Sequence, residues 1–222
     1  MRIVALSDLH GETAGLSAMR AEVAAADVVL LAGDITHFGQ ARAAAEVVNA
    51  VRRHNQRVLA VPGNCDRPEV EAYLADEGIS LDVRNVVIDG VAFAGVGGSL
   101  PCPGRTPNEI TEAQFAEYLA QAVEGLDQSR PLILLVHQPP FGTVADLAAS
   151  GRHVGSEEMR SFIVERRPLA CFAGHIHEAR GKDRIGETAV LNPGSLRAGG
   201  YAYAEVDVQT GTLLDAGVSV VR

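Results

Sequence analysis

The chain has 222 residues, of which 47% are hydrophobic, and a formal net charge of −9 at pH 7. This length is enough for one domain with a sizeable core, and no apolar run approaches the ~20 residues of a membrane-spanning helix. The negative charge repels a polyanion, which argues against a general nucleic-acid binder but leaves a small phosphorylated substrate open.

The N-terminus enters an apolar strand at once and lacks the ordered regions of a signal peptide, so we expect a cytoplasmic protein without a membrane partner. The three cysteines lie at unrelated spacings and do not form a disulfide framework. We find no repeat, linker or low-complexity tail. We therefore expect a single domain over residues 1–222 and leave a homo-oligomer open.

The first expected strand, residues 2–7, ends in Asp8-Leu9-His10-Gly11. Asp8 and His10 are two residues apart, so in an extended segment their side chains point to the same side. A carboxylate and an imidazole just past a strand suit a borderline divalent metal. The alternative is a turn aspartate beside a solvated histidine. Residues 16–25 carry apolar positions at helical spacing and predict a helix.

A short apolar run over residues 28–32 predicts a buried strand that ends in Gly33 and Asp34. Open α/β sheets place their ligands at this carboxyl edge. A carboxylate has two oxygens, so Asp34 can touch two metal ions at once; capping the next turn is the alternative. His37 lies one short loop further on, where it either contacts substrate or is merely exposed.

A helix expected over residues 41–54 leads to a third buried strand, residues 57–61, which ends in Pro62-Gly63-Asn64-Cys65-Asp66. Asn64 can give a metal a neutral carbonyl oxygen, although Gly-Asn turns are also common. Arg67-Pro68 then opens a helix to about residue 77.

From residue 79 the pattern changes. Two apolar runs, 86–88 and 91–94, flank Asp89-Gly90, which is a strong hairpin signal. The fold is therefore not purely parallel. We interpret residues 95–99 as a tight turn at the rim of a site and residues 111–128 as a helix.

The next core strand, residues 132–136, ends at His137. A long loop over residues 141–155 follows and contains His153; such loops often carry substrate contacts. After a helix over 156–166, the strand 169–173 exits as Gly174-His175-Ile176-His177. From Gly181 onward, alternating strands and turns predict a meander of β-hairpins.

Five polar motifs thus each follow an apolar strand directly, and five such coincidences at one sheet edge argue against turns and caps alone. Their candidate ligands number about as many as two metals sharing one carboxylate require. These candidates are Asp8, His10, Asp34, Asn64, His137, His175 and His177.

Together the motifs resemble the calcineurin-like metallophosphoesterase family over nearly the whole chain. The resemblance implies an α/β fold, a four-layer α/β/β/α sandwich with two mixed β-sheets. It implies one metal on Asp8, His10, Asp34 and His177, and a second on Asp34, Asn64, His137 and His175. The segment Gly174-His175-Ile176-His177-Glu178 looks most like the small prokaryotic phosphoesterases of that family. One departure is Gly-Asn-Cys-Asp, because many members have histidine where this chain has Cys65.

Two metals ~3.5–4 Å apart can hold a bridging hydroxide that attacks phosphorus in line, and they neutralise charge on the phosphoryl oxygens. Mixed oxygen and nitrogen ligands fit manganese, iron or zinc better than magnesium, and we expect manganese first. We take five residues as catalytic candidates, namely Asp34, Asn64, Cys65, Asp66 and His153.

We therefore expect a metal-dependent phosphoester hydrolase, and a phosphodiesterase more than a monoesterase. Cys65 cannot carry the positive charge of an imidazole, and a monoester dianion loses most from its absence. The alternative is a non-catalytic metal-binding scaffold of the same fold. A third hypothesis is a nuclease, but the sequence lacks the Lys/Arg-rich run that would favour binding to a nucleic acid.

Overall fold

The computed structural model describes residues 1–221. One sheet consists of β11 (Thr212–Val220), β10 (Gly200–Asp207), β1 (Arg2–Leu6), β2 (Val28–Ala32) and β3 (Val58–Val61), in that spatial order. The other consists of β4 (Arg84–Ile88), β5 (Val91–Val96), β6 (Leu132–Val136), β7 (Ala170–Phe172), β9 (Thr188–Asn192) and β8 (Gly181–Ile185). Both sheets contain parallel and antiparallel pairs, as the sequence predicts.

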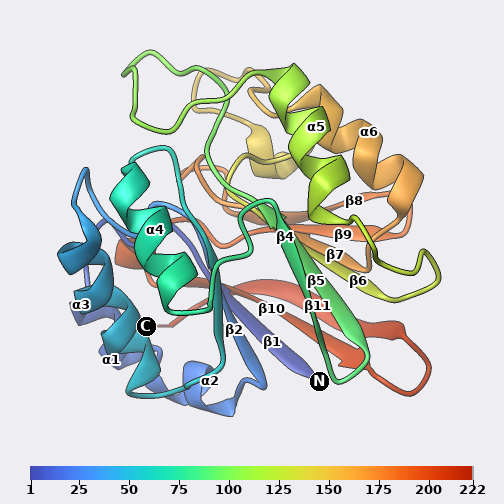
Figure 1. Ribbon diagram of the computed structural model, residues 1–222, viewed down its shortest axis with the longest axis horizontal. Helices are drawn as coiled ribbons and strands as arrows, with labels where there is room; N and C mark the ends of the chain where they lie inside the picture. The colour runs from blue at the N-terminus through green and yellow to red at the C-terminus, as the bar shows by residue number, and fades with distance from the viewer. Residues whose placement is uncertain (222) are drawn as a thin grey trace.

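Helices cover the two outer faces of the stacked sheets (Figure 1). On one side lie α1 (Ala14–Ala18), α2 (Arg20–Ala25), α3 (Ala41–Arg52) and α4 (Pro68–Asp76). On the other lie α5 (Glu112–Ala122) and α6 (Glu157–Arg166), and two short 3₁₀ helices, η1 (Val144–Asp146) and η2 (Leu196–Ala198), sit in loops. The predicted four-layer α/β/β/α sandwich is therefore confirmed.

The hydrophobic core falls into three layers because side chains alternate across each strand. In β1, Ile3 packs between the two sheets, whereas Val4 packs under the helices of the first side. In β6, Ile133 packs between the sheets and Leu134 packs under α5 and α6. Both faces of these strands are buried, which is why they read as continuous apolar runs.

Four sequence predictions need correction. The strands from Gly181 onward do not form one meander, because the hairpin of β8 and β9 belongs to the second sheet and the hairpin of β10 and β11 to the first. The helix expected over 16–25 is two helices, because the backbone at Met19 (φ −88°, ψ 2°) leaves the helical region. The helix expected to reach 128 ends at Ala122, shortly before Gly125 turns the chain with a φ of +76°. The turn expected over 95–99 begins later, because Gly95 and Val96 belong to β5.

The parallel strands bring the ends of distant segments to one edge. β1 pairs in parallel with β2 and β2 with β3, and in the second sheet β6 pairs in parallel with β7. The loops beyond these strands are joined by backbone hydrogen bonds, from Asp8 N to the carbonyl oxygen of Gly33 (3.1 Å) and from Gly174 N to that of His137 (3.0 Å). All five polar motifs therefore lie at the same edge of the sandwich.

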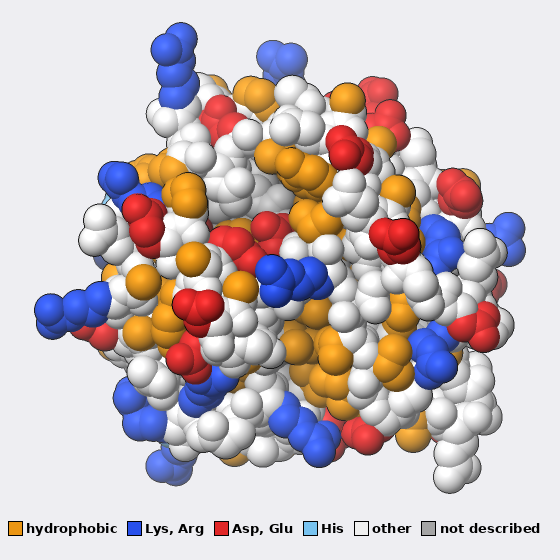
Figure 2. All heavy atoms as spheres, in the orientation of Figure 1, with side chains coloured by type: hydrophobic (Ala, Val, Ile, Leu, Met, Phe, Trp, Pro, Cys, Tyr) orange, Lys and Arg blue, Asp and Glu red, His pale blue; other side chains and the backbone are white. Residues whose placement is uncertain are grey.

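On the face shown in Figure 2, basic and acidic side chains are interspersed and do not gather into one basic field. This arrangement matches the overall negative charge and offers no electrostatic track for a nucleic acid on this face. Among residues 1–221, no helix is both long and apolar enough to cross a membrane.

One buried carboxyl in α4 predicts a pH-dependent stability. Glu71 accepts a hydrogen bond from the Ser80 hydroxyl (2.7 Å), but its Oε2 is buried without a partner, and burial raises the pKa of Glu71 to about 7. The folded state therefore binds this proton more tightly than the unfolded chain does. Its contribution to stability is present below the ordinary pKa of 4.5 and is lost as pH rises through about 7.

Because glutamine does not titrate, we expect Glu71→Gln to remove this pH-dependent loss of stability. The variant should unfold at a higher temperature than the wild type at about pH 8, but should show no such advantage at about pH 5. Thermal unfolding of both proteins at the two pH values checks this. An equal change in unfolding temperature between the two pH values in wild type and variant would show that Glu71 has the same pKa in the folded and unfolded chain.

Candidate metal centre

Asp8, His10, Asp34 and His177 bring their polar atoms together beyond β1, β2 and β7. The Nε2 atom of His10 lies 3.2 Å from Nε2 of His177 and 3.7 Å from Oδ2 of Asp34. The Nε2 atom of His177 lies 3.1 Å from Oδ1 of Asp8. Asp8, His10 and His177 thus lie close enough to hold one metal ion, and Oδ2 of Asp34 borders the same space.

A second group of donors surrounds the other oxygen of Asp34. Nε2 of His137 lies 3.5 Å from Oδ1 of Asp34 and 2.9 Å from Oδ1 of Asn64. The Nδ1 atom of His137 lies 2.8 Å from the carbonyl oxygen of Ala32, which can only accept, so Nδ1 donates. In a neutral His137, Nε2 therefore turns a lone pair toward two acceptor oxygens. A cation between these three atoms would satisfy all of them.

His175 lies beside this second group. The centre of its ring is 5.1 Å from that of His137, and its backbone N–H donates to Oδ2 of Asp8 (3.1 Å). Burial and the neighbouring His137 lower the pKa of His175 to about 4, so its ring is neutral at pH 7 and has a free lone pair. Among the described residues, Asp8, Asp34 and His137 form one group of donors close enough to hold a metal ion, and His175 belongs to none of the three such groups.

The backbone is strained where these side chains originate. Asp8, His10, Asp34 and His175 have φ angles of 53°, 48°, 48° and 69°, in the left-handed region that non-glycine residues seldom adopt. Each such residue costs on the order of 1 kcal/mol, and strain of this kind clusters at functional sites. The strain therefore supports a functional role for this edge.

Glycines make the close approach of the motifs feasible. A Cβ atom on Gly33 would collide with the ring of His137, one on Gly63 with Asp34, and one on Gly174 with the Ser7 hydroxyl. Only a residue without a side chain fits at these three positions. The glycine before each polar residue is thus a requirement of packing and not only of the turn.

Buried hydrogen bonds hold the two aspartates in place. Both Ser7 Oγ (2.7 Å) and the backbone N–H of His175 donate to Oδ2 of Asp8, and the backbone N–H of Cys65 donates to Oδ1 of Asp34 (2.8 Å). Burial raises the pKa of Asp8. The hydrogen bond from His177 and the positive charge of the His177 ring outweigh this effect, so the pKa of Asp8 is lowered to about 2. The role of Ser7 was missed in the sequence, where its only signal is its place directly before Asp8.

A family model for calcineurin-like phosphoesterases matches residues 1–179, the part of the chain that carries all of these motifs. The chain belongs to the calcineurin-like phosphoesterase family. Members of this family are generally dimetal phosphoester hydrolases. The predicted resemblance is therefore confirmed.

Known proteins similar to this chain include the uncharacterized protein MJ1162 of Methanocaldococcus jannaschii. The two are 38% identical over 197 residues, which cover 87% of this chain and 88% of that protein. In fold, the chain is similar to TT1561 of Thermus thermophilus, with a TM-score of 0.76, 22% identity and coverage of 100% and 99% of the two chains. It is also similar to a dimetal phosphatase from Danio rerio, with a TM-score of 0.61, 12% identity and 92% coverage of each chain.

The side chain of Asp66 faces the backbone of neighbouring loops. Its carboxylate accepts hydrogen bonds from the N–H groups of Ile35 (3.0 Å), Thr36 (2.8 Å) and Gly63 (2.8 Å) and from the Thr36 hydroxyl (2.8 Å). Burial and the charge of Asp34 raise its pKa to about 6. The structure thus makes Asp66 a brace between the loops that carry Asp34 and Asn64.

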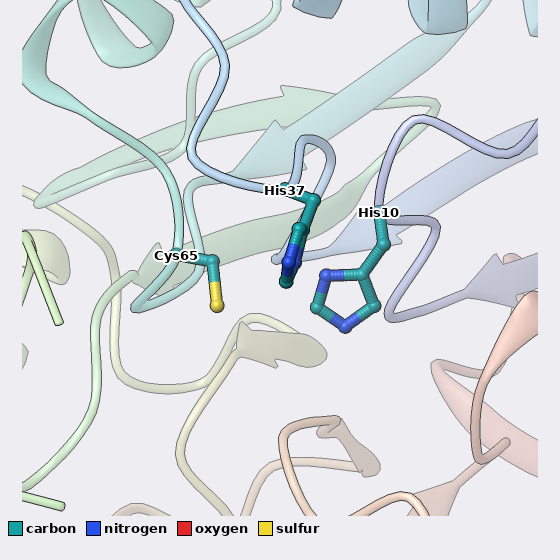
Figure 3. Close-up of side chains that lie close together, drawn as sticks. All are labelled: His10, His37 and Cys65. Atoms are coloured by element: carbon teal, nitrogen blue, oxygen red, sulfur yellow. The ribbon is translucent and has the colours of Figure 1, made fainter. Parts of the chain in front are cut away.

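The remaining candidates occupy different places. Cys65 is buried, and burial together with Asp34 raises the pKa of its thiol far above the usual range, so the thiol is neutral. His37 is exposed, and its ring centre lies 5.4 Å from that of His10 (Figure 3). His153 instead lies with its Nδ1 atom 2.7 Å from Oδ1 of Asp146 and packs near Phe141.

Proposed function

We propose that this chain hydrolyses phosphodiesters with two divalent cations, manganese first and iron or zinc as alternatives. The observation that carries the proposal is that Nε2 of His137 lies 2.9 and 3.5 Å from oxygens of Asn64 and Asp34, while its Nδ1 lies 2.8 Å from the carbonyl oxygen of Ala32. The proposed ligands of one cation are Asp8, His10, Asp34 and His177, and those of the other are Asp34, Asn64, His137 and His175.

When bound, the two cations would lower the pKa of water toward neutrality and offset the charge of the phosphoryl oxygens. The chain's own hydrogen bonds hold the proposed ligands in place. The carbonyl of Ala32 fixes the ring of His137, and the N–H of Cys65 fixes one oxygen of Asp34. Such outer hydrogen bonds set the tautomer and direction of a ligand, so they support metal affinity.

Cys65 supports a preference for diesters. Its neutral thiol offers no positive charge to offset the second negative charge of a monoester. We expect Cys65→His to raise the ratio of aryl monoester to aryl diester hydrolysis by about tenfold or more, because an imidazole can be charged or donate a proton. Rates on a matched pair of aryl substrates check this. A wild-type enzyme that already prefers the monoester would contradict it.

His37 and His153 remain candidates for contact with the substrate. The place of His37 beside His10 favours it, whereas His153 is engaged with Asp146. We expect His37→Ala to lower turnover by about tenfold, the effect of one lost hydrogen bond to a charged group, with the two-metal centre intact. His153→Ala is the comparison, and metal analysis accompanies both assays. Unchanged kinetics in both variants would exclude the two histidines from the reaction.

A substrate panel tests the proposed activity. Manganese-loaded protein is assayed on cyclic nucleotides, dinucleotides, phospholipid diesters and monoesters. Turnover of one diester class above the monoesters supports the proposal. Two bound metals without turnover on any of them would favour the alternative, a metal-binding scaffold of the same fold. A cytoplasmic location and a homo-oligomer stay predictions.

A further inference from the structure

Three side chains meet beside the candidate metal centre without being part of one ligand set. His10, His37 and Cys65 project from the loops after β1, β2 and β3 toward a common space (Figure 3). One potential ligand atom of each lies within 4.8 Å of those of the other two. We propose that they form a third metal site, which takes a soft ion such as zinc.

The ring of His10 has a free nitrogen for this site. Its Nε2 atom lies among Asp34 and His177, whereas its Nδ1 atom is buried without a hydrogen-bond partner. Figure 3 shows a ring nitrogen of His10 turned toward His37 and Cys65. A buried polar atom without a partner is unfavourable, so a ligand on that side would remove a cost.

The donor types select the ion. A thiol sulfur and two imidazole nitrogens suit zinc and other ions of similar softness, whereas manganese prefers oxygen. Three protein ligands leave a fourth position of a tetrahedral zinc site open. The thiol sets this donor set apart from the mixed oxygen and nitrogen ligands of the two-metal centre, so the softest ions should favour the site with Cys65.

The loop that carries His37 is tied to the segment after Cys65, because the carbonyl of Phe38 accepts a hydrogen bond from Nε of Arg67 (2.9 Å). The ring of His37 lies beside that of Phe38, with ring centres 4.7 Å apart, and Phe38 has a φ of 59°, a strained conformation for a bulky residue. This hydrogen bond keeps the loops of His37 and Cys65 next to each other.

Zinc binding at this site competes with the centre for His10. Bonds form from zinc to the sulfur and to one nitrogen of each histidine, the S–H bond of Cys65 breaks, and its proton goes to solvent. His10 binds through Nδ1 only in the tautomer that carries its proton on Nε2. That tautomer has no lone pair on Nε2 for a metal in the centre, so a soft ion here removes His10 from the ligands of the centre.

Cobalt gives a readout that does not depend on turnover. Manganese-loaded protein is mixed with Co²⁺, whose bond to sulfur produces a near-ultraviolet charge-transfer band that oxygen and nitrogen ligands do not give. We expect the band in the wild type, its loss in Cys65→Ser and its weakening in His37→Ala. Cys102→Ser is the matched control, because Cys102 is a free thiol held elsewhere, near Thr106 and Glu109, and this variant should keep the band.

Metal analysis after addition of zinc completes the test. The wild type should bind one more zinc per chain than Cys65→Ser does. Cobalt bound without the band, or a band that survives Cys65→Ser, would overturn the third site. An enzyme that is active with manganese but shows no band with cobalt would reject this site alone, whereas a protein that is inactive with manganese before cobalt is added, and then shows the band, would reject only the proposed activity.

Discussion

Asp34→Asn is expected to lower turnover by about a thousandfold and to release both metals. Asp34 turns Oδ2 toward His10 and Oδ1 toward His137, so its two oxygens serve both donor groups. An amide is neutral and has a single acceptor oxygen, which removes the shared ligand and one negative charge. Elemental analysis of protein purified with manganese, together with hydrolysis of an aryl diester, measures both effects.

Asp146→Asn is the matched control, because Asp146 is also a buried aspartate but lies in the 141–155 loop. This variant should keep its metals. Activity near the wild-type level in Asp34→Asn would show that the two-metal reading is wrong.

Asp66→Ala is expected to destabilise the protein by about 3 kcal/mol or more and to weaken metal binding. The substitution leaves four buried donors unpaired, and each unsatisfied group costs about 1–3 kcal/mol before water or relaxation relieves it. Asp66 joins the two segments that carry Asp34 and Asn64. Without its hydrogen bonds these segments can separate, and the ligands in both donor groups then move apart. Urea unfolding and manganese titration measure the two effects.

Asp146 again offers the comparison, since it too accepts four hydrogen bonds, from the N–H groups of Gly142, Thr143 and Gly155 and from His153. Asp146→Ala should destabilise the protein to a similar extent while leaving manganese affinity unchanged. Equal losses of manganese affinity in both variants would show that Asp66 supports metal binding no more than a buried aspartate elsewhere does.

The strand ends were predictable because buried parallel strands leave a plain signal, an apolar run followed by a polar residue, in some cases after a glycine. Asp34 and His137 were found in this way, and the structure turns both toward one space. The period of the pattern also located the strands of both sheets. The pattern could not show why glycine is required at these positions. A Cβ on Gly63 would collide with Asp34, and this collision arises only because two segments 29 residues apart meet in space.

Other features depend on contacts that no local pattern records. Asp66 sits in the same motif as Asn64, yet its four backbone and hydroxyl partners make it a brace, which only the folded loops reveal. His153 lies in a long loop that suggested a substrate contact, whereas the structure pairs it with Asp146. The meeting of His37 with Cys65 beside His10 likewise arises from three separate loops.

The most direct test of the two-metal centre is a crystal structure of protein loaded with manganese, with anomalous difference maps recorded for that metal. We expect two peaks that share Asp34, one near Asp8, His10 and His177 and the other near Asn64, His137 and His175. A single peak, or peaks that do not share Asp34, would contradict the proposed centre.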